Sequence, residues 1–115
     1  MRGSKRIRKE SSKGYNYMKL IIAVVRPFVV DRLVVALEEI ENFPGVTITD
    51  TEGFGQRVRT PDDAINPLKP NKRIEVVTPD EMVETIVAAI KEHARTGRKG
   101  DGFVIVLEIE ESALI

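Results

Sequence analysis

The sequence contains no cysteine, no tryptophan and only one histidine, and it has no long apolar run. Without cysteine the chain can form no disulfide, zinc ribbon or thiol centre. His93 alone cannot build a transition-metal site, because the remaining carboxylates favour magnesium or calcium. The apolar run Leu20 to Val25 is too short for a membrane span or a signal-peptide core. These absences predict a cytoplasmic protein without a bound metal.

The formal net charge is zero, but the charges are unevenly distributed. Residues 1–17 carry six basic side chains and one acidic side chain, so the rest of the chain is acidic. A basic arm can contact nucleic acid or an acidic membrane. The opening Met1 to Ser4 instead resembles an expression-vector leader, and Met18 is a plausible natural start. We therefore predict a disordered basic leader over 1–17 and a single domain over 18–115 that does not bind nucleic acid.

The first half of the domain alternates between strand and helix patterns. Residues 19–25 form a β-branched run that is typical of a strand buried on both faces. Asp31 opens an amphipathic helix, which the turn at 42–45 ends. Residues 46–51 alternate at period two, as a half-exposed strand does, and 53–55 close that strand.

The second half repeats this order after a long connection. Residues 56–72 show no periodicity and contain three prolines, which indicates a loop. Residues 74–77 are a predicted strand, and Thr78 as N-cap with Glu81 completes a predicted capping box at the start of a helix. That helix runs to about Arg95, and 103–109 form a predicted fourth strand.

This order predicts the α+β class, as a ferredoxin-like βαββαβ sandwich: a four-stranded antiparallel sheet with two helices on one face. Two helices cover only one face of such a sheet. The first and fourth predicted strands are apolar on both sides, so the second face must also be covered. Another copy of the chain is the simplest cover, and the sequence therefore predicts a homo-oligomer.

A glycine-rich stretch, Thr96 to Gly102, follows the second predicted helix. Glycines there allow backbone N–H groups to converge, and Arg98 and Lys99 add positive charge, so the stretch could hold a phosphate. The same residues also fit an ordinary helix end at Gly97 followed by a turn into a strand. From the residues alone, both interpretations stay open.

Several motifs occur together in an order that resembles PII-type nitrogen regulatory proteins, over about residues 18–112. They are Val25-Arg26-Pro27-Phe28, Gly45-Val46-Thr47-Ile48-Thr49, Glu52-Gly53-Phe54-Gly55, Arg73-Ile74-Glu75-Val76-Val77 and Ala94-Arg95-Thr96-Gly97-Arg98-Lys99-Gly100-Asp101-Gly102.

The resemblance implies a homotrimer with ATP or ADP in clefts between subunits. It also implies a 2-oxoglutarate-sensing loop at 56–72 that docks onto a membrane transporter or a metabolic enzyme. Thr47 would touch the adenine and Val77 would offer it backbone groups. The predicted nucleotide-binding set is completed by residues near the ribose and phosphates: Gly53, Phe54, Gly55, Gln56, Gly97, Arg98, Lys99, Gly100, Asp101 and Gly102.

The sequence also departs from the family pattern. Phe103 stands where the family has a phosphate-binding lysine, and Asn71 where it has a lysine at the end of the long loop. Gln56 and Arg57 are in the reverse of the family order. The loop is short and has no tyrosine for nucleotidylation, and the chain stops before the family's basic tail. These departures favour a divergent PII-like branch that binds ADP, AMP or ATP, and they make 2-oxoglutarate a doubtful ligand.

Two other classes remain as alternatives. One is a trimeric sensor of a small anion or metal, of the copper-tolerance (CutA) type. The other is a constitutive interaction module in which the glycine stretch is only a turn. We do not expect an enzyme, because Asp62 and Asp63 lie in a proline-rich loop without a fixed partner.

Overall fold

The computed structural model describes residues 17–55, 61 and 65–115. Residues 1–16 of the leader predicted over 1–17 lie outside this part of the chain, and so does Gln56. The strands and helices are β1 (Met18–Val25), α1 (Val30–Glu38), β2 (Thr47–Gly53), β3 (Lys69–Pro79), α2 (Val83–Ala94) and β4 (Gly102–Ile109), with short 3-10 helices η2 (Pro27–Val29) and η4 (Asp80–Met82).

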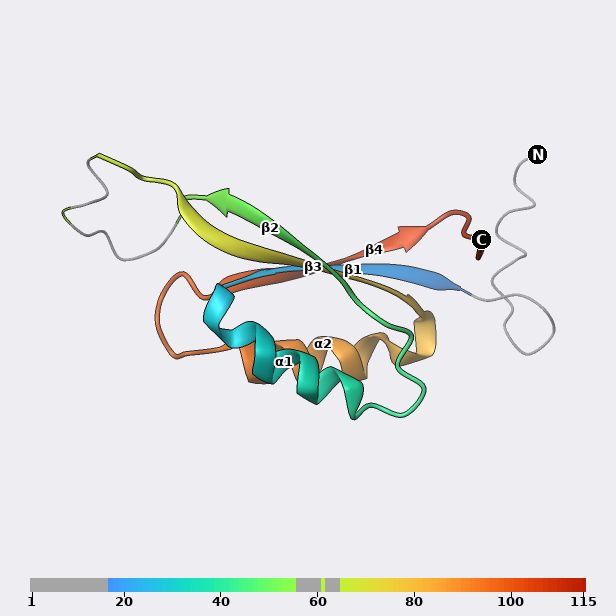
Figure 1. Ribbon diagram of the computed structural model, residues 1–115. Helices are drawn as coiled ribbons and strands as arrows, with labels where there is room; N and C mark the ends of the chain where they lie inside the picture. The colour runs from blue at the N-terminus through green and yellow to red at the C-terminus, as the bar shows by residue number, and fades with distance from the viewer. Residues whose placement is uncertain (1–16, 56–60, 62–64) are drawn as a thin grey trace.

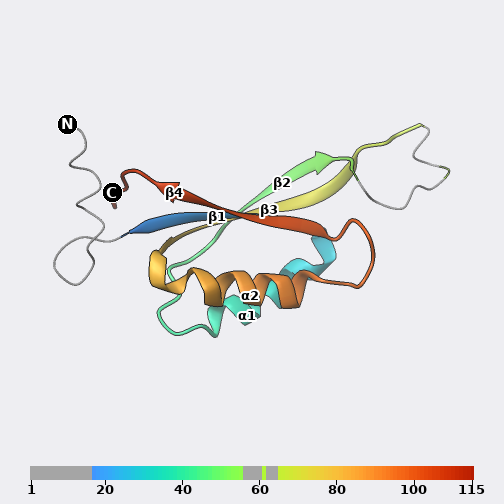
Figure 2. The same cartoon turned by 180° about the vertical axis from the view of Figure 1, so that it is seen from behind.

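The four strands form one sheet in the order β2-β3-β1-β4, and every neighbouring pair is antiparallel. Both helices lie on the same side of the sheet (Figures 1 and 2). Strand β1 is central, since it pairs with β3 on one side and with β4 on the other. The predicted βαββαβ sandwich is therefore confirmed.

The hydrophobic core lies between the sheet and the two helices. Ala23 of β1 lies opposite Ile74 of β3, so both point toward the helices. Leu33 of α1 and Ile86 of α2 are fully buried against them. Each such aliphatic side chain stabilises the fold by roughly 1.5–3 kcal/mol through burial. The apolar face of each helix is thus the face that forms this core.

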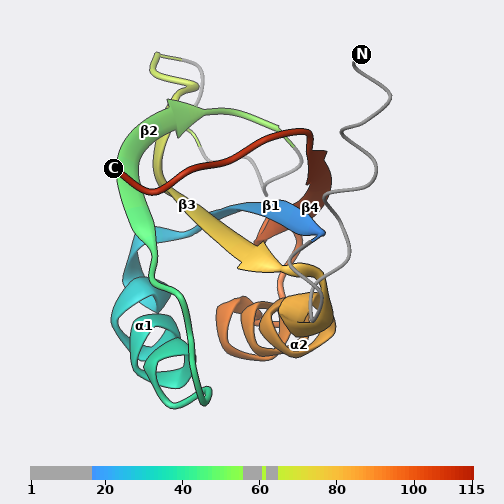
Figure 3. The same cartoon turned by 90° about the vertical axis from the view of Figure 1, so that its right-hand side faces the viewer.

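The opposite face of the sheet carries no helix in the part of the chain described (Figure 3). The strand register places the alternate residues of β1, β3 and β4 on this open face. Its exposed apolar side chains are 43–55% accessible and comprise Val77, Phe103, Ile105 and Leu107. An uncovered apolar surface of this kind is typical of a protein–protein contact.

Strand β3 is longer than the sequence pattern predicts. It begins at Lys69, so the last four residues of the predicted 56–72 loop are strand. This extension pairs with β2, from Gly53 opposite Lys69 to Asp50 opposite Lys72. Pro70 fits there because it lies beyond the last pair that joins β1 to β3, and no ladder bond to β1 requires its missing N–H.

The capping box predicted at Thr78 is wrong. Thr78 belongs to β3, opposite Lys19, and is fully buried. Its hydroxyl donates to the carbonyl of Pro79 at 3.2 Å, and no side chain caps η4 or α2. The 3-10 turn of η4 replaces the expected capped start of the helix.

None of the helices described is long and apolar enough to cross a membrane.

Candidate functional site

A cleft of about 560 Å³ opens at one end of the uncovered sheet face. It brings together two glycine elements that are far apart in the sequence: the end of β2 and the loop before β4. Its lining residues are Val24, Thr51, Glu52, Gly53, Phe54, Gly55, Asn71, Arg73, Gly100, Gly102 and Phe103. Five residues of the predicted nucleotide-binding set are among them.

The first side of the cleft is formed by Gly53, the last residue of β2, and by Phe54 and Gly55 after it. The Phe54 ring is 66% exposed. Phe103 at the start of β4 also lines the cleft and is 55% exposed. Two accessible aromatic rings at one cleft can receive a planar group by stacking.

The second side of the cleft is formed by Gly100, in the loop of residues 95–101 between α2 and β4, and by Gly102 and Phe103 at the start of β4. Gly102 has a φ of +124°, a conformation that side-chain-bearing residues rarely adopt. A Cβ at Gly102 would also lie 1.9 Å from the carbonyl oxygen of Val24. Only glycine lets the backbone approach β1 this closely at the cleft.

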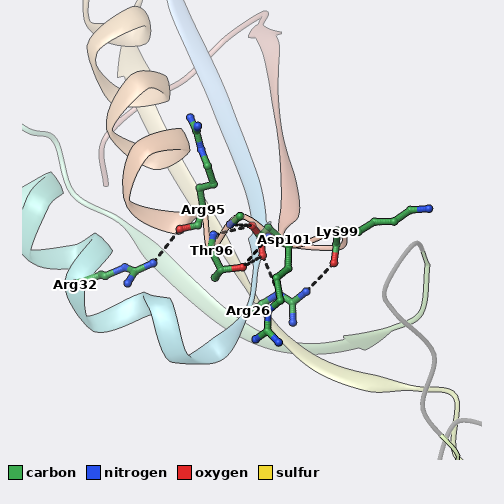
Figure 4. A network of polar contacts seen from close by, with 8 residues as sticks. Arg26, Arg32, Arg95, Thr96, Lys99 and Asp101 are labelled. Atoms are coloured by element: carbon green, nitrogen blue, oxygen red, sulfur yellow. Dashed lines mark hydrogen bonds and ion pairs between the residues drawn. The ribbon is translucent and has the colours of Figure 1, made fainter.

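Asp101 holds this loop together from inside (Figure 4). Its Oδ2 accepts hydrogen bonds from the amides of Thr96, at 2.7 Å, and Gly97, at 3.1 Å. Its Oδ1 accepts from the hydroxyl of Thr96 and from Nε of Arg26, the latter at 3.0 Å. The carboxylate of Asp101 is therefore already bonded to the amides of Thr96 and Gly97, two of the N–H groups that the sequence suggested as phosphate donors.

These contacts also set the ionisation of Asp101. Burial acts to raise its pKa, but the hydrogen bonds from Thr96 and Gly97 and the positive charge of Arg26 outweigh that effect and lower the pKa to about 2. Asp101 is thus a carboxylate at neutral pH.

The remaining predicted residues do not line the cleft. Thr47 of β2 pairs with Glu75 of β3, and Val77 lies two residues after Glu75, so all three share one face of the sheet. This is the open face, at a distance from the cleft. Arg98 and Lys99 are exposed on the loop, and Lys99 extends away from the Asp101 network (Figure 4).

Sequence reasoning missed two residues of this region. Arg73 lines the cleft and donates from Nε to Glu75 at 2.8 Å. Arg26 was quoted only as part of a motif, yet it bonds both Asp101 and the carbonyl of Lys99. The only feature of the sequence that could have singled out Arg26 is its position directly after the apolar strand β1.

No group of three His, Cys, Asp or Glu side chains gathers as a metal site among the residues described. His93 is only partly exposed, and its carbonyl accepts a hydrogen bond from Arg32 at 2.7 Å.

Comparison with known proteins identifies the family. Residues 18–115 match the family described as "Nitrogen regulatory protein P-II". The Nitrogen regulatory protein P-II of Bradyrhizobium diazoefficiens is 37% identical over 103 residues, covering 85% of this chain and 91% of the relative. The Nitrogen regulatory protein P-II 1 of Escherichia coli K12 is 36% identical over 98 residues, covering 80% and 86%.

Among solved structures, the chain is similar to that of Arabidopsis thaliana PII bound to citrate, with a TM-score of 0.66 and 30% identity. The match covers 80% of this chain and 74% of the plant chain. The family match, the identity to curated relatives and the likeness to a solved structure agree, and the chain belongs to the P-II family of nitrogen regulatory proteins.

Proposed function

We propose that this chain is a trimeric signal-transduction protein of the cytoplasm that binds an adenine nucleotide in clefts between protomers. Through the segment 56–72 it regulates a membrane transporter or a metabolic enzyme. The observation that carries the proposal is the cleft itself, in which Gly53–Gly55 and the two glycines Gly100 and Gly102 line one space.

The chemistry of the cleft suits a nucleotide. Glycine backbone on two sides allows close approach of phosphate oxygens. Arg73 contributes a guanidinium group to the lining, paired with Glu75, and the rings of Phe54 and Phe103 offer stacking surfaces for a base. Pockets that combine apolar rings with a few polar groups are typical of small-molecule sites.

The open face of the sheet supports assembly with further copies of the chain. Val77 and Ile105 are about half exposed there, although their neighbours in the sheet are apolar. Packing this face against another protomer would bury them and bring its Thr47 and Val77 toward the adjacent cleft. We therefore assign adenine contacts to Thr47 and Val77 of the neighbouring protomer, and phosphate contacts to the glycine loop.

2-Oxoglutarate is not part of the proposal. Asn71, which lines the cleft, replaces the lysine that the family resemblance led us to expect. The ammonium group of Lys72, next to it, pairs with the carboxylate of Asp50 instead. Citrate is included as a test ligand, because the related Arabidopsis PII structure holds it.

Isothermal titration of the full chain with ATP, ADP, AMP and citrate tests the ligand. Sedimentation velocity on the same sample tests the trimer. We expect at least one adenine nucleotide to bind with a Kd below the millimolar range, and Arg73→Gln to weaken it. Absence of heat for all nucleotides at millimolar concentration would refute nucleotide binding.

One observation favours a second candidate, the constitutive interaction module. Asp101 already satisfies the amides of Thr96 and Gly97, as expected if the glycine loop is only a turn. In that case a partner captured through segment 56–72 would bind equally well with and without nucleotide. A nucleotide-dependent affinity for the partner would instead support the signalling function.

A further inference from the structure

The loop beside the cleft is tied to the end of β1 by one side chain. Arg26 follows β1 directly and reaches the loop with two groups (Figure 4). Its Nε donates to Oδ1 of Asp101 at 3.0 Å, and its Nη2 donates to the carbonyl of Lys99 at 2.9 Å. Both side chains of the ion pair are largely buried, with 17% and 18% of their surface exposed.

Asp101 passes this restraint to the start of the loop. Its carboxylate accepts hydrogen bonds from the amide and the hydroxyl of Thr96 and from the amide of Gly97. The hydroxyl oxygen of Thr96 in turn accepts a hydrogen bond from the amide of Arg98 at 3.3 Å. Bonds to an ionised acceptor are stronger than those between neutral groups. The loop is therefore held near its end, where Arg26 bonds Asp101 and the carbonyl of Lys99, and at its start, where the carboxylate of Asp101 bonds Thr96 and Gly97.

The two faces of the loop have different neighbours. Gly100 lines the cleft, Asp101 lines a groove between α2 and β4, and Gly102 lines both. The amides of Thr96 and Gly97 are already bonded to the carboxylate of Asp101. The amides left to receive a phosphate in the cleft are therefore those of Gly100 and Gly102.

From this geometry we propose that Arg26 and Asp101 are positioning residues of the nucleotide cleft. They hold the 96–101 loop in its ligand-ready shape before any ligand arrives, so that Gly100 and Gly102 need no rearrangement to receive a phosphate. Binding then avoids the entropic cost of ordering the loop. The inference rests on the proposed nucleotide site, but the shape of the free loop can be measured without a ligand.

The test uses Asp101→Asn and Arg26→Gln in the full chain, with two readouts. The first is amide hydrogen exchange in the free protein. Because the anchor is lost, the amides of Thr96 and Gly97 should exchange at least about tenfold faster in both variants. The second is nucleotide affinity by titration, which should fall about tenfold. The double variant should lose little more nucleotide affinity than either single variant, because the two residues act as one unit.

Conservative variants separate positioning from general stability. Thr96→Ser keeps the hydroxyl and should behave as wild type, whereas Thr96→Val removes it and should resemble Asp101→Asn. Arg26→Lys should be intermediate, because one ammonium group cannot hold the carboxylate of Asp101 and the carbonyl of Lys99 together. Lys19→Gln removes the ion pair with Asp80 at the opposite end of β1 from the cleft residue Val24, so it should lower Tm without weakening nucleotide binding.

Two results would overturn the inference. One is loop amide exchange within twofold of wild type in both Asp101→Asn and Arg26→Gln. The other is faster exchange with unchanged nucleotide affinity. If the wild-type protein binds none of the nucleotides, the proposed function fails and with it the link to the cleft, while the exchange rates still decide whether the pair shapes the loop.

Discussion

A Cβ placed on Gly102 would lie 1.9 Å from the carbonyl oxygen of Val24, in the neighbouring strand. Gly102 also has a φ of +124°. We therefore expect Gly102→Ala to lower the free energy of unfolding by at least about 2 kcal/mol, through strain and overpacking together. Urea denaturation measures this loss.

Gly55→Ala is the matched control. Gly55 lines the same cleft, but a Cβ there would meet nothing within 4 Å. Its effect on stability should stay within about 0.5 kcal/mol. Equal losses for the two variants would contradict the assigned role of the Val24 contact.

Asp101 makes stability depend on pH in the acid range. Its pKa is about 2 in the folded protein against an ordinary value of 3.8, so the unfolded chain binds the proton more readily. The stabilisation is therefore complete above about pH 5 and is lost as the pH falls through 4 toward 2. We expect it to amount to about 1–2 kcal/mol, since the carboxylate keeps some contact with water.

Denaturation of wild type and Asp101→Asn between pH 7 and pH 2.5 measures this contribution. The difference in stability between the two proteins should shrink as the pH falls. Asp50→Asn controls for the loss of one charge, because Asp50 is 84% exposed in its pair with Lys72. A gap between wild type and Asp101→Asn that is constant with pH would show that Asp101 keeps its ordinary acidity.

Thr78 offers a test of burial against capping. An N-cap threonine tolerates serine, which keeps the hydroxyl, and loses about 1 kcal/mol when the oxygen is removed. Thr78 is instead fully buried in β3. We therefore expect Thr78→Ser to cost about 1 kcal/mol for the lost methyl group and Thr78→Val to cost less, as measured by thermal unfolding. The reverse order would restore the capping interpretation.

The open face of the sheet gives the prediction for assembly. Ile105 is 44% exposed on this face, in the edge strand β4 and opposite Ile22 of β1. Ile105→Glu would place a charge in the proposed protomer contact and should convert the proposed trimer to monomers in sedimentation velocity. Val35→Glu, at a 55% exposed position on α1, should leave the trimer intact. Two unchanged trimers would mean that another surface makes the contact.

Local patterns in the sequence predicted most of the fold. Apolar periodicity located both helices and all four strands, and the run at 19–25 correctly indicated a strand with apolar residues on both faces. The start of β3 was missed because Pro70 and its polar neighbours have no alternation. That stretch is a strand only because β2 pairs with it, from Gly53 to Asp50, and a long-range partner leaves no local signal.

The candidate site, like the fold, could be predicted only in part from the sequence. The glycine loop was recognisable because its residues are adjacent in the sequence and follow a helix end. The anchoring of that loop was not, since Arg26 and Asp101 are 75 positions apart. A cationic side chain after a strand has many possible partners, and only the strand register selects one. The predicted roles of Thr47 and Val77 remain predictions, because they require a second protomer.

The position of β1 has a consequence for synthesis. This strand leaves the ribosome first, but its neighbours β3 and β4 follow much later, and Arg26 meets Asp101 only when the last strand is added. A nascent chain therefore contains Gly53, Phe54 and Gly55 before the cleft that they line has formed. The cleft therefore exists only after the loop before β4 has been synthesised and β4 has paired with β1.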